Sequence, residues 1–266
     1  MVRLIEFLLL LGAAYWLYAR WRNSNRIEES TNQNKQTKPT VAPVQPMVEC
    51  AYCNLRLPMN EALSHAGNYF CDASHRDAIN AKGWLGAAKF SPSANFNERP
   101  DTSIDTLVIH HISLPVGKFG GGFVEDFFCN RLNVELDPYF KEIGHLQVSS
   151  HFLIDRQGSL TQFVGCNDRA WHAGMSNLFE RDQCNDFSIG IELEGTGEAE
   201  YTSAQYETLA KLTNIIKKKY PIQYIVGHSD ISPERKTDPG LSFDWEIYRQ
   251  KANISEVQMP FGTTSR

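Results

Sequence analysis

The chain has 266 residues, which is room for one domain of about 150–200 residues together with smaller parts. Its apolar fraction of 42% fits a globular protein, and its net charge of −5 gives no general attraction to nucleic acid. Six cysteines are too few for a disulfide-dense scaffold.

The first part of the chain, residues 1–22, is predicted to be a single-pass anchor in the inner membrane. Leu4 to Ala19 is almost wholly apolar, and its 16 residues would span about 24 Å as a helix, against about 30 Å of hydrocarbon. Three arginines follow this run and one precedes it, so the positive-inside rule places the rest of the chain on the cytoplasmic side. A cleaved signal peptide and an interfacial helix are the alternatives. A signal peptide fits less well, because the basic flank is on the wrong side and no A-x-A-like site is present.

Residues 23–46 are rich in Asn, Gln, Thr, Lys and Pro and are expected to form a flexible linker. A small zinc-ribbon-like module is predicted next, over residues 47–82. It contains Cys50-Ala-Tyr-Cys53 and, after a spacer of 17 residues, Cys71-Asp-Ala-Ser-His75. Two thiolates on a tight turn and a Cys/His pair one helical turn apart can close a tetrahedron around zinc.

A unit of about 35 residues has too little core to fold without such a metal. We therefore expect a second, structural Zn²⁺ in this module, held by Cys50, Cys53, Cys71 and His75. No Lys/Arg cluster surrounds these ligands, so no nucleic-acid partner is expected. Residues 83–100 are interpreted as a further linker.

The large domain is predicted over residues 101–256, followed by a tail over 257–266. Apolar runs of strand length are mixed with helical patterns there, which favours an α/β (α+β) fold with a mixed central β-sheet flanked by helices. Thr202-Ser-Ala-Gln205 is a capping box that opens a helix running to about Lys219. Strands are predicted over 104–112, 149–154, 159–164, 187–194 and 224–226, with a hairpin turn at Asp155-Arg-Gln-Gly158 between the second and the third. A further helix is predicted over 124–132.

Polar side chains that could form a site occur on two of these strands. His110 and His111 end the first strand, and because successive side chains point to opposite faces, they cannot both bind one metal. The periodicity does not say which of them does. Glu192 and Glu194 share the face of a later strand with small neighbours, which is typical of a cleft floor or of a solvent-facing edge strand.

The loop after the last strand offers ligands and a cation. His228, Asp230 and Asp238 could supply one nitrogen and two oxygen ligands, and Lys236 a positive charge. A catalytic zinc site takes three protein ligands and leaves one position for water. We expect His228 and Asp238 to be two of the three ligands.

Four motifs in order resemble the AmpD-type N-acetylmuramoyl-L-alanine amidases. The resemblance covers about Ile104 to Tyr248, and its motifs are Ile109-His-His-Ile-Ser-Leu-Pro-Val-Gly-Lys-Phe-Gly-Gly121, Arg169-Ala-Trp-His-Ala-Gly174, Cys184-Asn-Asp-Phe-Ser-Ile-Gly-Ile-Glu-Leu-Glu-Gly195 and Gly227-His-Ser-Asp-Ile-Ser-Pro-Glu-Arg-Lys-Thr-Asp-Pro-Gly240. The implied fold is a mixed sheet flanked by helices, shared with peptidoglycan recognition proteins. The implied activity is zinc-dependent cleavage between N-acetylmuramic acid, expected in its 1,6-anhydro form, and L-alanine of muropeptides, in peptidoglycan recycling or turnover. The sequence does not distinguish an anhydro-muropeptide substrate from intact peptidoglycan.

The resemblance also implies roles for single residues. It selects His110 over His111 as the first zinc ligand, joins it to His228 and Asp238, and leaves the fourth position to water. It implies Glu192 as general base and Lys236 as the cation near the scissile carbonyl. Trp171 and His172 are implied to contact the substrate.

Two departures and two alternatives accompany this resemblance. Gln147 and Gln183 stand where arginines are expected, and arginine is the usual fork for a stem-peptide carboxylate, so peptide specificity is open. One alternative is a non-catalytic peptidoglycan-binding protein; the other is a docking protein that acts through the ribbon, with an auxiliary amidase domain. The ribbon itself resembles short membrane-anchored bacterial proteins with the pattern M-V-x-C-x-x-C…Y-F-C-x-x-x-H, which implies only a structural or docking module.

Overall fold

The computed structural model describes residues 11–23 and 45–264, and the chain divides into two units, Met1–Gln45 and Pro46–Arg266. In the first unit, residues 11–23 form a helix. Among the described residues, no helix combines the length and the apolar character needed to cross a membrane. The first ten residues of the predicted anchor, and nearly all of the expected linker over 23–46, lie outside the described residues.

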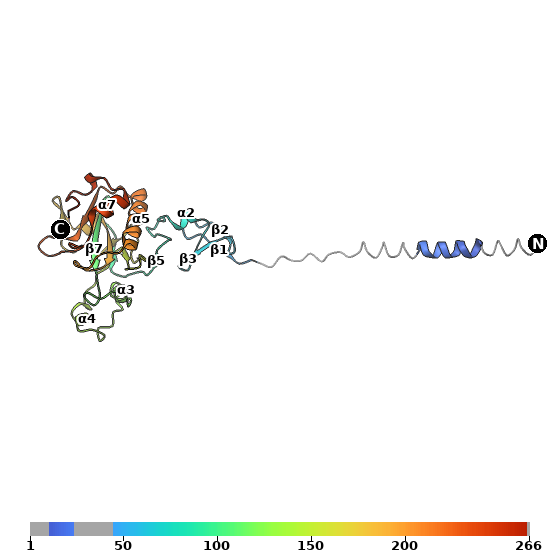
Figure 1. The fold of residues 1–266 in the computed structure, drawn as a ribbon, viewed down its shortest axis with the longest axis horizontal. Coiled ribbons are helices and arrows are strands. Elements are labelled where there is room, and N and C mark those ends of the chain that lie inside the picture. The colour runs from blue at the N-terminus through green and yellow to red at the C-terminus, as the bar shows by residue number, and fades with distance from the viewer. Residues whose placement is uncertain (1–10, 24–44, 265–266) are drawn as a thin grey trace, which may run out of the picture. The chain divides into compact units, whose positions relative to one another are not determined.

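The second unit begins with the predicted ribbon. Two antiparallel hairpins and one helical turn make up this module (Figure 1). The turn follows Asp72, whose carboxylate caps it by accepting from the amide of His75 at 2.8 Å. The elements are β1 (Met47–Glu49), β2 (Arg56–Pro58), β3 (Leu63–His65), β4 (Asn68–Phe70) and α2 (Ala73–Arg76).

A six-stranded mixed sheet forms the centre of the second unit, in the order β14-β7-β13-β8-β9-β5. The four strands from β14 to β8 run parallel to their neighbours, while β8 and β9 form the predicted antiparallel hairpin. All seven residues of β13 are buried, as expected for a strand covered on both faces. The strands are β5 (Lys89–Phe90), β7 (Thr106–Ile112), β8 (Phe152–Ile154), β9 (Leu160–Gln162), β13 (Ser188–Glu194) and β14 (Tyr224–Gly227).

Helices cover the sheet and confirm the predicted fold class. On one face, the apolar stripe of α5 packs with α7 on Leu107, Ile109 and Ile191. The predicted capping box of α5 is present, since Thr202 and Gln205 exchange side-chain to backbone hydrogen bonds of 3.1 Å. The helices are α3 (Phe123–Phe128), α4 (Pro138–Ile143), η1 (Cys184–Asp186), α5 (Ser203–Lys219), α6 (His228–Ile231), α7 (Trp245–Ala252) and η2 (Glu256–Gln258).

Unlike the expected linker, residues 83–100 contain two short strands, and the first of them pairs with the amidase sheet. β5 joins the free edge of β9, and the amides of Ser91 and Ser93 donate to the carbonyls of Gln162 and Phe163. Further along, β6 (Phe96–Asn97) pairs with β10 (Arg169–Ala170). The Ser/Asn/Pro composition suggested a linker, but an unpaired strand edge accepts any extended segment that can reach it. A further two-stranded pair consists of β11 (Asn177–Leu178) and β12 (Arg181–Asp182).

Candidate active site

Strand register brings three polar side chains from distant parts of the chain together. Gly227 of β14 lies beside Ile109 of β7, so His228 follows directly next to His110. The ring atoms His110 Nδ1 and His228 Nδ1 are 3.0 Å apart, and Asp238 Oδ2 lies 3.0 Å and 3.1 Å from them. All three residues are buried. They form one of two groups of metal-ligating type within the part of the chain that the structure describes.

The chemistry of this group fits a metal ion. Burial, followed by the nearby His228, lowers the pKa of His110 to about 4, so its ring is neutral and offers a lone pair. Burial raises the pKa of Asp238, but hydrogen bonds from His110 and His228 outweigh it and keep that pKa well below its usual value. Zinc with nitrogen ligands at about 2.0–2.1 Å needs ligand atoms about 3.3 Å apart in a tetrahedron. The three atoms match one face of such a tetrahedron.

The two histidines of β7 differ in where they lie relative to the ligand group. His110 points into the ligand group, whereas His111, the next residue along the strand, belongs to neither group of possible ligands among the described residues. Strand alternation explains this, because side chains one residue apart leave opposite faces of the sheet.

Glu192 lies next to the ligand group by register. It pairs with His110 across the parallel strands β13 and β7, so the two side chains leave the same face of the sheet. Glu192 is buried, and its Oε2 has no hydrogen-bond partner among the described residues. Burial, followed by the charge of Asp238, raises the pKa of Glu192 well above its usual value, and Lys236 opposes this shift. A buried carboxylate with a free oxygen is poised to exchange a proton with a molecule in the cleft.

A cleft of about 750 Å³ opens above these residues. Lys236, Trp171 and His172 line it together with Glu192 and the three ligand residues. The indole of Trp171 is fixed, because its Nε1 donates to Asn97 Oδ1 at 2.7 Å.

One wall of the cleft was missed by sequence reasoning. It comes from α3, α4 and the segment after them, and it is mainly apolar. These residues show only an ordinary core pattern in sequence, so no signal marked them as lining. They are Phe127, Phe128, Tyr139, Ile143, Leu146 and Val148.

The other polar candidates have structural partners. Glu194 accepts from the amides of Gly120 and Arg156, and so holds the glycine-rich loop before α3. Asp230 Oδ2 accepts from the amide of Gly227 at 2.7 Å and stabilises the turn that presents His228. His151 is buried and accepts from the amide of Gly190 at Nδ1 (3.0 Å). His145 is exposed.

The ribbon residues form the second group of possible metal ligands. His75 Nδ1 lies 3.0 Å from Cys71 Sγ and 3.8 Å from Cys50 Sγ, and the thiols of Cys53 and Cys71 are 3.9 Å apart. A tetrahedral zinc with sulfur at about 2.3 Å requires separations of about 3.5–3.8 Å. Burial raises the pKa of Cys50, but backbone amides led by that of Cys53 outweigh it and bring the pKa to about 6.

The site combines two histidines, an aspartate and a buried glutamate at one end of a cleft beside the mixed sheet, an arrangement typical of a metal-dependent hydrolase. Residues 100–241 match the family model of N-acetylmuramoyl-L-alanine amidase. The chain belongs to this family.

Relatives of known activity agree with this assignment. The chain is 54% identical over 171 residues to the 1,6-anhydro-N-acetylmuramyl-L-alanine amidase AmpD of Haemophilus influenzae, covering 63% of this chain and 93% of that protein. It is 48% identical over 171 residues to the protein of that name from Escherichia coli, with 63% and 93% covered. The crystal structure of a selenomethionine derivative of AmpD matches with a TM-score of 0.63 and 49% identity, over 64% of this chain and 97% of that one. The amidase domain therefore spans nearly all of these relatives, and the residues before it lie outside the matched family region.

Proposed function

We propose that this protein hydrolyses the amide bond between N-acetylmuramic acid, in its 1,6-anhydro form, and L-alanine of muropeptides, in peptidoglycan recycling. The observation that carries this proposal is the group His110, His228 and Asp238, with the buried Glu192 beside it at the end of the cleft. The relatives named above supply the substrate class.

The group of two histidines and one aspartate would hold zinc. When bound, zinc supplies a Lewis acid that makes water a nucleophile near neutral pH. Glu192 accepts the proton of the attacking water as the new carbon–oxygen bond forms. The same carboxyl then gives this proton to the alanine nitrogen as the carbon–nitrogen bond breaks, which leaves a carboxylate and a free amine.

Lys236 and Trp171 at the rim of the cleft act on the substrate, the first through its charge and the second by orienting it. Lys236 is half-buried in the cleft wall and provides a positive charge for the oxygen that becomes negative during the attack. Trp171 offers a flat aromatic surface of fixed orientation to a sugar ring or peptide.

The two glutamines at positions where arginines were expected are exposed, Gln147 and Gln183. Gln183 accepts a hydrogen bond from Arg169 at 3.5 Å, so an arginine is still present near that position.

A product assay on two substrates tests this function. Purified protein is incubated with an anhydro-muropeptide and, separately, with intact peptidoglycan, and the products are identified by mass spectrometry. We expect stem peptide from the anhydro-muropeptide, loss of activity on chelation and its return with zinc. Release of stem peptide only from intact peptidoglycan would mean that the protein acts in wall turnover and not in recycling. Amidase activity that persists after the loss of all metal would refute the mechanism.

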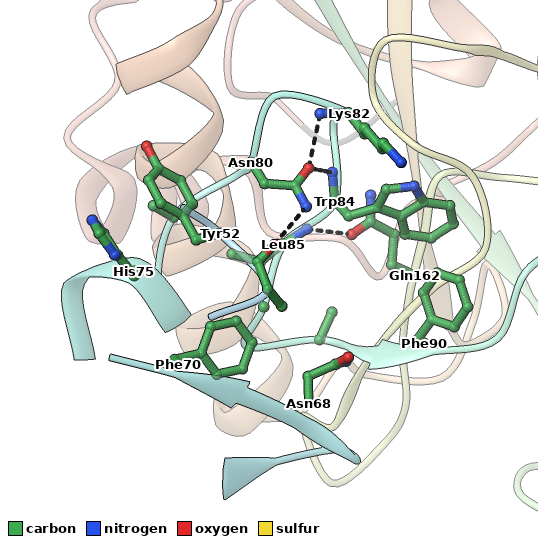
Figure 2. A pocket seen from close by; sticks show the side chains of 14 residues that line it. Tyr52, Asn68, Phe70, His75, Asn80, Lys82, Trp84, Leu85, Phe90 and Gln162 are labelled. Atoms are coloured by element: carbon green, nitrogen blue, oxygen red, sulfur yellow. Dashed lines mark hydrogen bonds between the residues drawn. The ribbon is translucent and has the colours of Figure 1, made fainter. Parts of the chain in front are cut away.

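We further propose that the ribbon binds a structural zinc through Cys50, Cys53, Cys71 and His75. The fit of their spacing to a tetrahedron supports this. The ribbon joins the amidase sheet around a hollow of about 280 Å³ (Figure 2), with Tyr52 and His75 on one side and Trp84 and Phe90 on the other.

Specific hydrogen bonds cross this junction. Gln162 of β9 binds the segment directly after the ribbon, since it accepts from the amide of Leu85 at 2.8 Å and donates to Gly83 O at 2.9 Å. Lys219 of α5 donates to the carbonyls of Ile79 and Asn80. Metal bound in the ribbon would therefore stabilise the edge of the amidase sheet as well as the ribbon.

Cys71→Ser should lower the zinc content from two ions per chain to one, because serine is a poor zinc ligand beside thiolates. The melting temperature should fall, while the remaining zinc and a measurable amidase activity persist. Zinc content measured by elemental analysis and thermal unfolding provide the readouts. Cys129→Ser is the matched control, since Cys129 lies near Ser91, away from both groups of ligands. Two zinc ions retained in Cys71→Ser would contradict the ribbon site.

We also propose that residues 1–22 anchor the protein in the inner membrane with the amidase domain on the cytoplasmic side. The apolar run and the arginines after it support this orientation. Reporter fusions at the carboxyl terminus test this orientation. A reporter that works only in the cytoplasm should be active, whereas activity of a reporter that works only in the periplasm would show that the orientation is the opposite one.

A further inference from the structure

The segment Trp171-His172-Ala173 contacts both histidines of the metal group at their Nε2 atoms, on the side away from the other ligands. Each of these histidines directs Nδ1 toward the other ligands, so its Nε2 needs a separate partner. His110 Nε2 lies 3.0 Å from His172 Nδ1, and His228 Nε2 lies 3.1 Å from Ala173 O. His172 and Ala173, which are adjacent in the chain, thus provide the Nε2 partners of the two ligand histidines.

The protons in this arrangement have one consistent placement. A metal-binding Nδ1 must carry a lone pair, so the ring proton of each ligand histidine sits on Nε2. His228 Nε2–H then donates to the carbonyl of Ala173. His110 Nε2–H donates to His172 Nδ1, which leaves the proton of His172 on its own Nε2.

The chain of donors continues from His172 to a backbone carbonyl. His172 Nε2–H faces Ser188 Oγ at 3.3 Å, and the Ser188 hydroxyl donates to Cys184 O at 2.5 Å. Every group in this chain donates once in the same direction, and the last acceptor is a carbonyl, which has no proton to give. The chain therefore fixes both the orientation and the tautomer of His110.

The residues around His172 leave space for its imidazole ring and hold its backbone in place. A Cβ on Gly190, in the middle of the buried strand β13, would lie 2.5 Å from His172 Cγ, so only glycine leaves room for the imidazole there. The buried Asn185 accepts from the amides of His172 (3.1 Å) and Ala173 (2.8 Å) through Oδ1. Gly190, Asn185 and Ser188 thus all support this single segment.

We propose that His172 is a positioning residue of the metal site, which acts through His110, and that Trp171 alone of this pair acts mainly on the substrate. This inference rests on the proposed function, because it assigns a role toward the zinc of that same site. Outer partners of metal-binding histidines typically contribute about 10- to 100-fold in metal affinity. The sequence resemblance implied a substrate contact for His172, and the contacts of its two ring nitrogens give it a different main task.

The test compares two substitutions at His172. His172→Phe keeps a planar ring but removes the acceptor, and should weaken metal binding at the amidase site by about 10- to 100-fold. His172→Asn places an amide oxygen near the position of Nδ1 and should recover much of this loss. Trp171→Phe is the matched control, with a raised KM and wild-type metal affinity.

Cobalt and zinc titrations of the full chain against a chelator provide the affinities. Thiolate ligands give cobalt an intense charge-transfer absorption that nitrogen and oxygen ligands lack, so the two sites can be followed separately. Added zinc should restore kcat to His172→Phe, which a residue that contacts only substrate would not show. Thermal unfolding of each variant establishes that it is folded.

Wild-type metal affinity in a folded His172→Phe, with only KM changed, would overturn the proposal. Should this variant fail to fold, Ser188→Ala tests the same chain, because it removes the acceptor of His172; unchanged affinity there would overturn the proposal equally. Failure of the proposed function has a different signature, in which the wild-type protein itself binds no metal at His110, His228 and Asp238.

Discussion

Glu192→Gln is expected to lower kcat by about 10² to 10⁴-fold, the usual contribution of a general acid–base group. The amide keeps the size of the side chain but cannot accept the proton of water or return it to the leaving nitrogen. Zinc content should stay at the wild-type value, because Glu192 lies beside the ligand group and is not part of it. Steady-state kinetics and elemental analysis on the same preparation measure both quantities.

Stability provides a second readout for this variant. The buried Glu192 has an oxygen without a partner among the described residues, and burial raises its pKa. An ionised carboxylate there costs folding free energy at neutral pH, so the metal-free Gln variant should melt no lower than the metal-free wild type. The exposed Glu200→Gln serves as control for the loss of one charge. A wild-type kcat in Glu192→Gln would remove Glu192 as the base.

Lys236→Met should lower kcat by about 10² to 10³-fold, comparable to the loss of one group that stabilises an oxyanion. Methionine keeps the apolar stem of the side chain and removes the ammonium, so the cleft wall should persist. Zinc affinity should change little or increase, since a positive charge close to the ligand group disappears. Kinetics with one anhydro-muropeptide and zinc competition separate these effects.

Lys218→Met is the matched control for this substitution, because Lys218 is exposed on α5 and does not line the cleft. It should leave kcat and KM unchanged. An effect of Lys236→Met on KM alone would mean that the ammonium binds substrate without favouring the transition state, and its assignment to the oxyanion would be wrong.

The parts of this fold that follow local rules were predictable. Hydrophobic runs located β7, β13 and β14, and the capping box located the start of α5, because strand alternation and helix capping depend on neighbouring residues. The mixed sheet followed from the way strands and helices are interleaved. The predicted helix over 124–132 ended earlier, since α3 stops at Phe128.

The parts that depend on long-range register were not predictable from the residues alone. Nothing local chooses between His110 and His111; the choice depends on which face of β7 meets α6 in the folded sheet. The pairing of Glu192 with His110 is likewise a matter of register between two strands whose paired residues are 82 positions apart in the chain. Residues 83–100 have a linker composition, and pairing with the distant strands β9 and β10 makes parts of them the strands β5 and β6.

The contacts of His172 show a further limit of sequence reasoning. A histidine beside a tryptophan before Ala-Gly is compatible with a substrate wall, a core position or a metal partner. Only the two ring nitrogens, one facing His110 and the other Ser188, distinguish between these roles. Hydrogen-bond partners depend on the position of whole strands, and no local pattern records them.

Hydrolysis of the anhydro-muropeptide in water enriched in heavy oxygen tests the central claim most directly. Attack of water on the lactyl carbonyl should place the heavy oxygen in the carboxylate of the muramic acid product, and the released peptide should be unlabelled with a free alanine amine. Mass spectrometry of the two products reads this out. Label in the peptide, or cleavage at any other bond, would contradict the account.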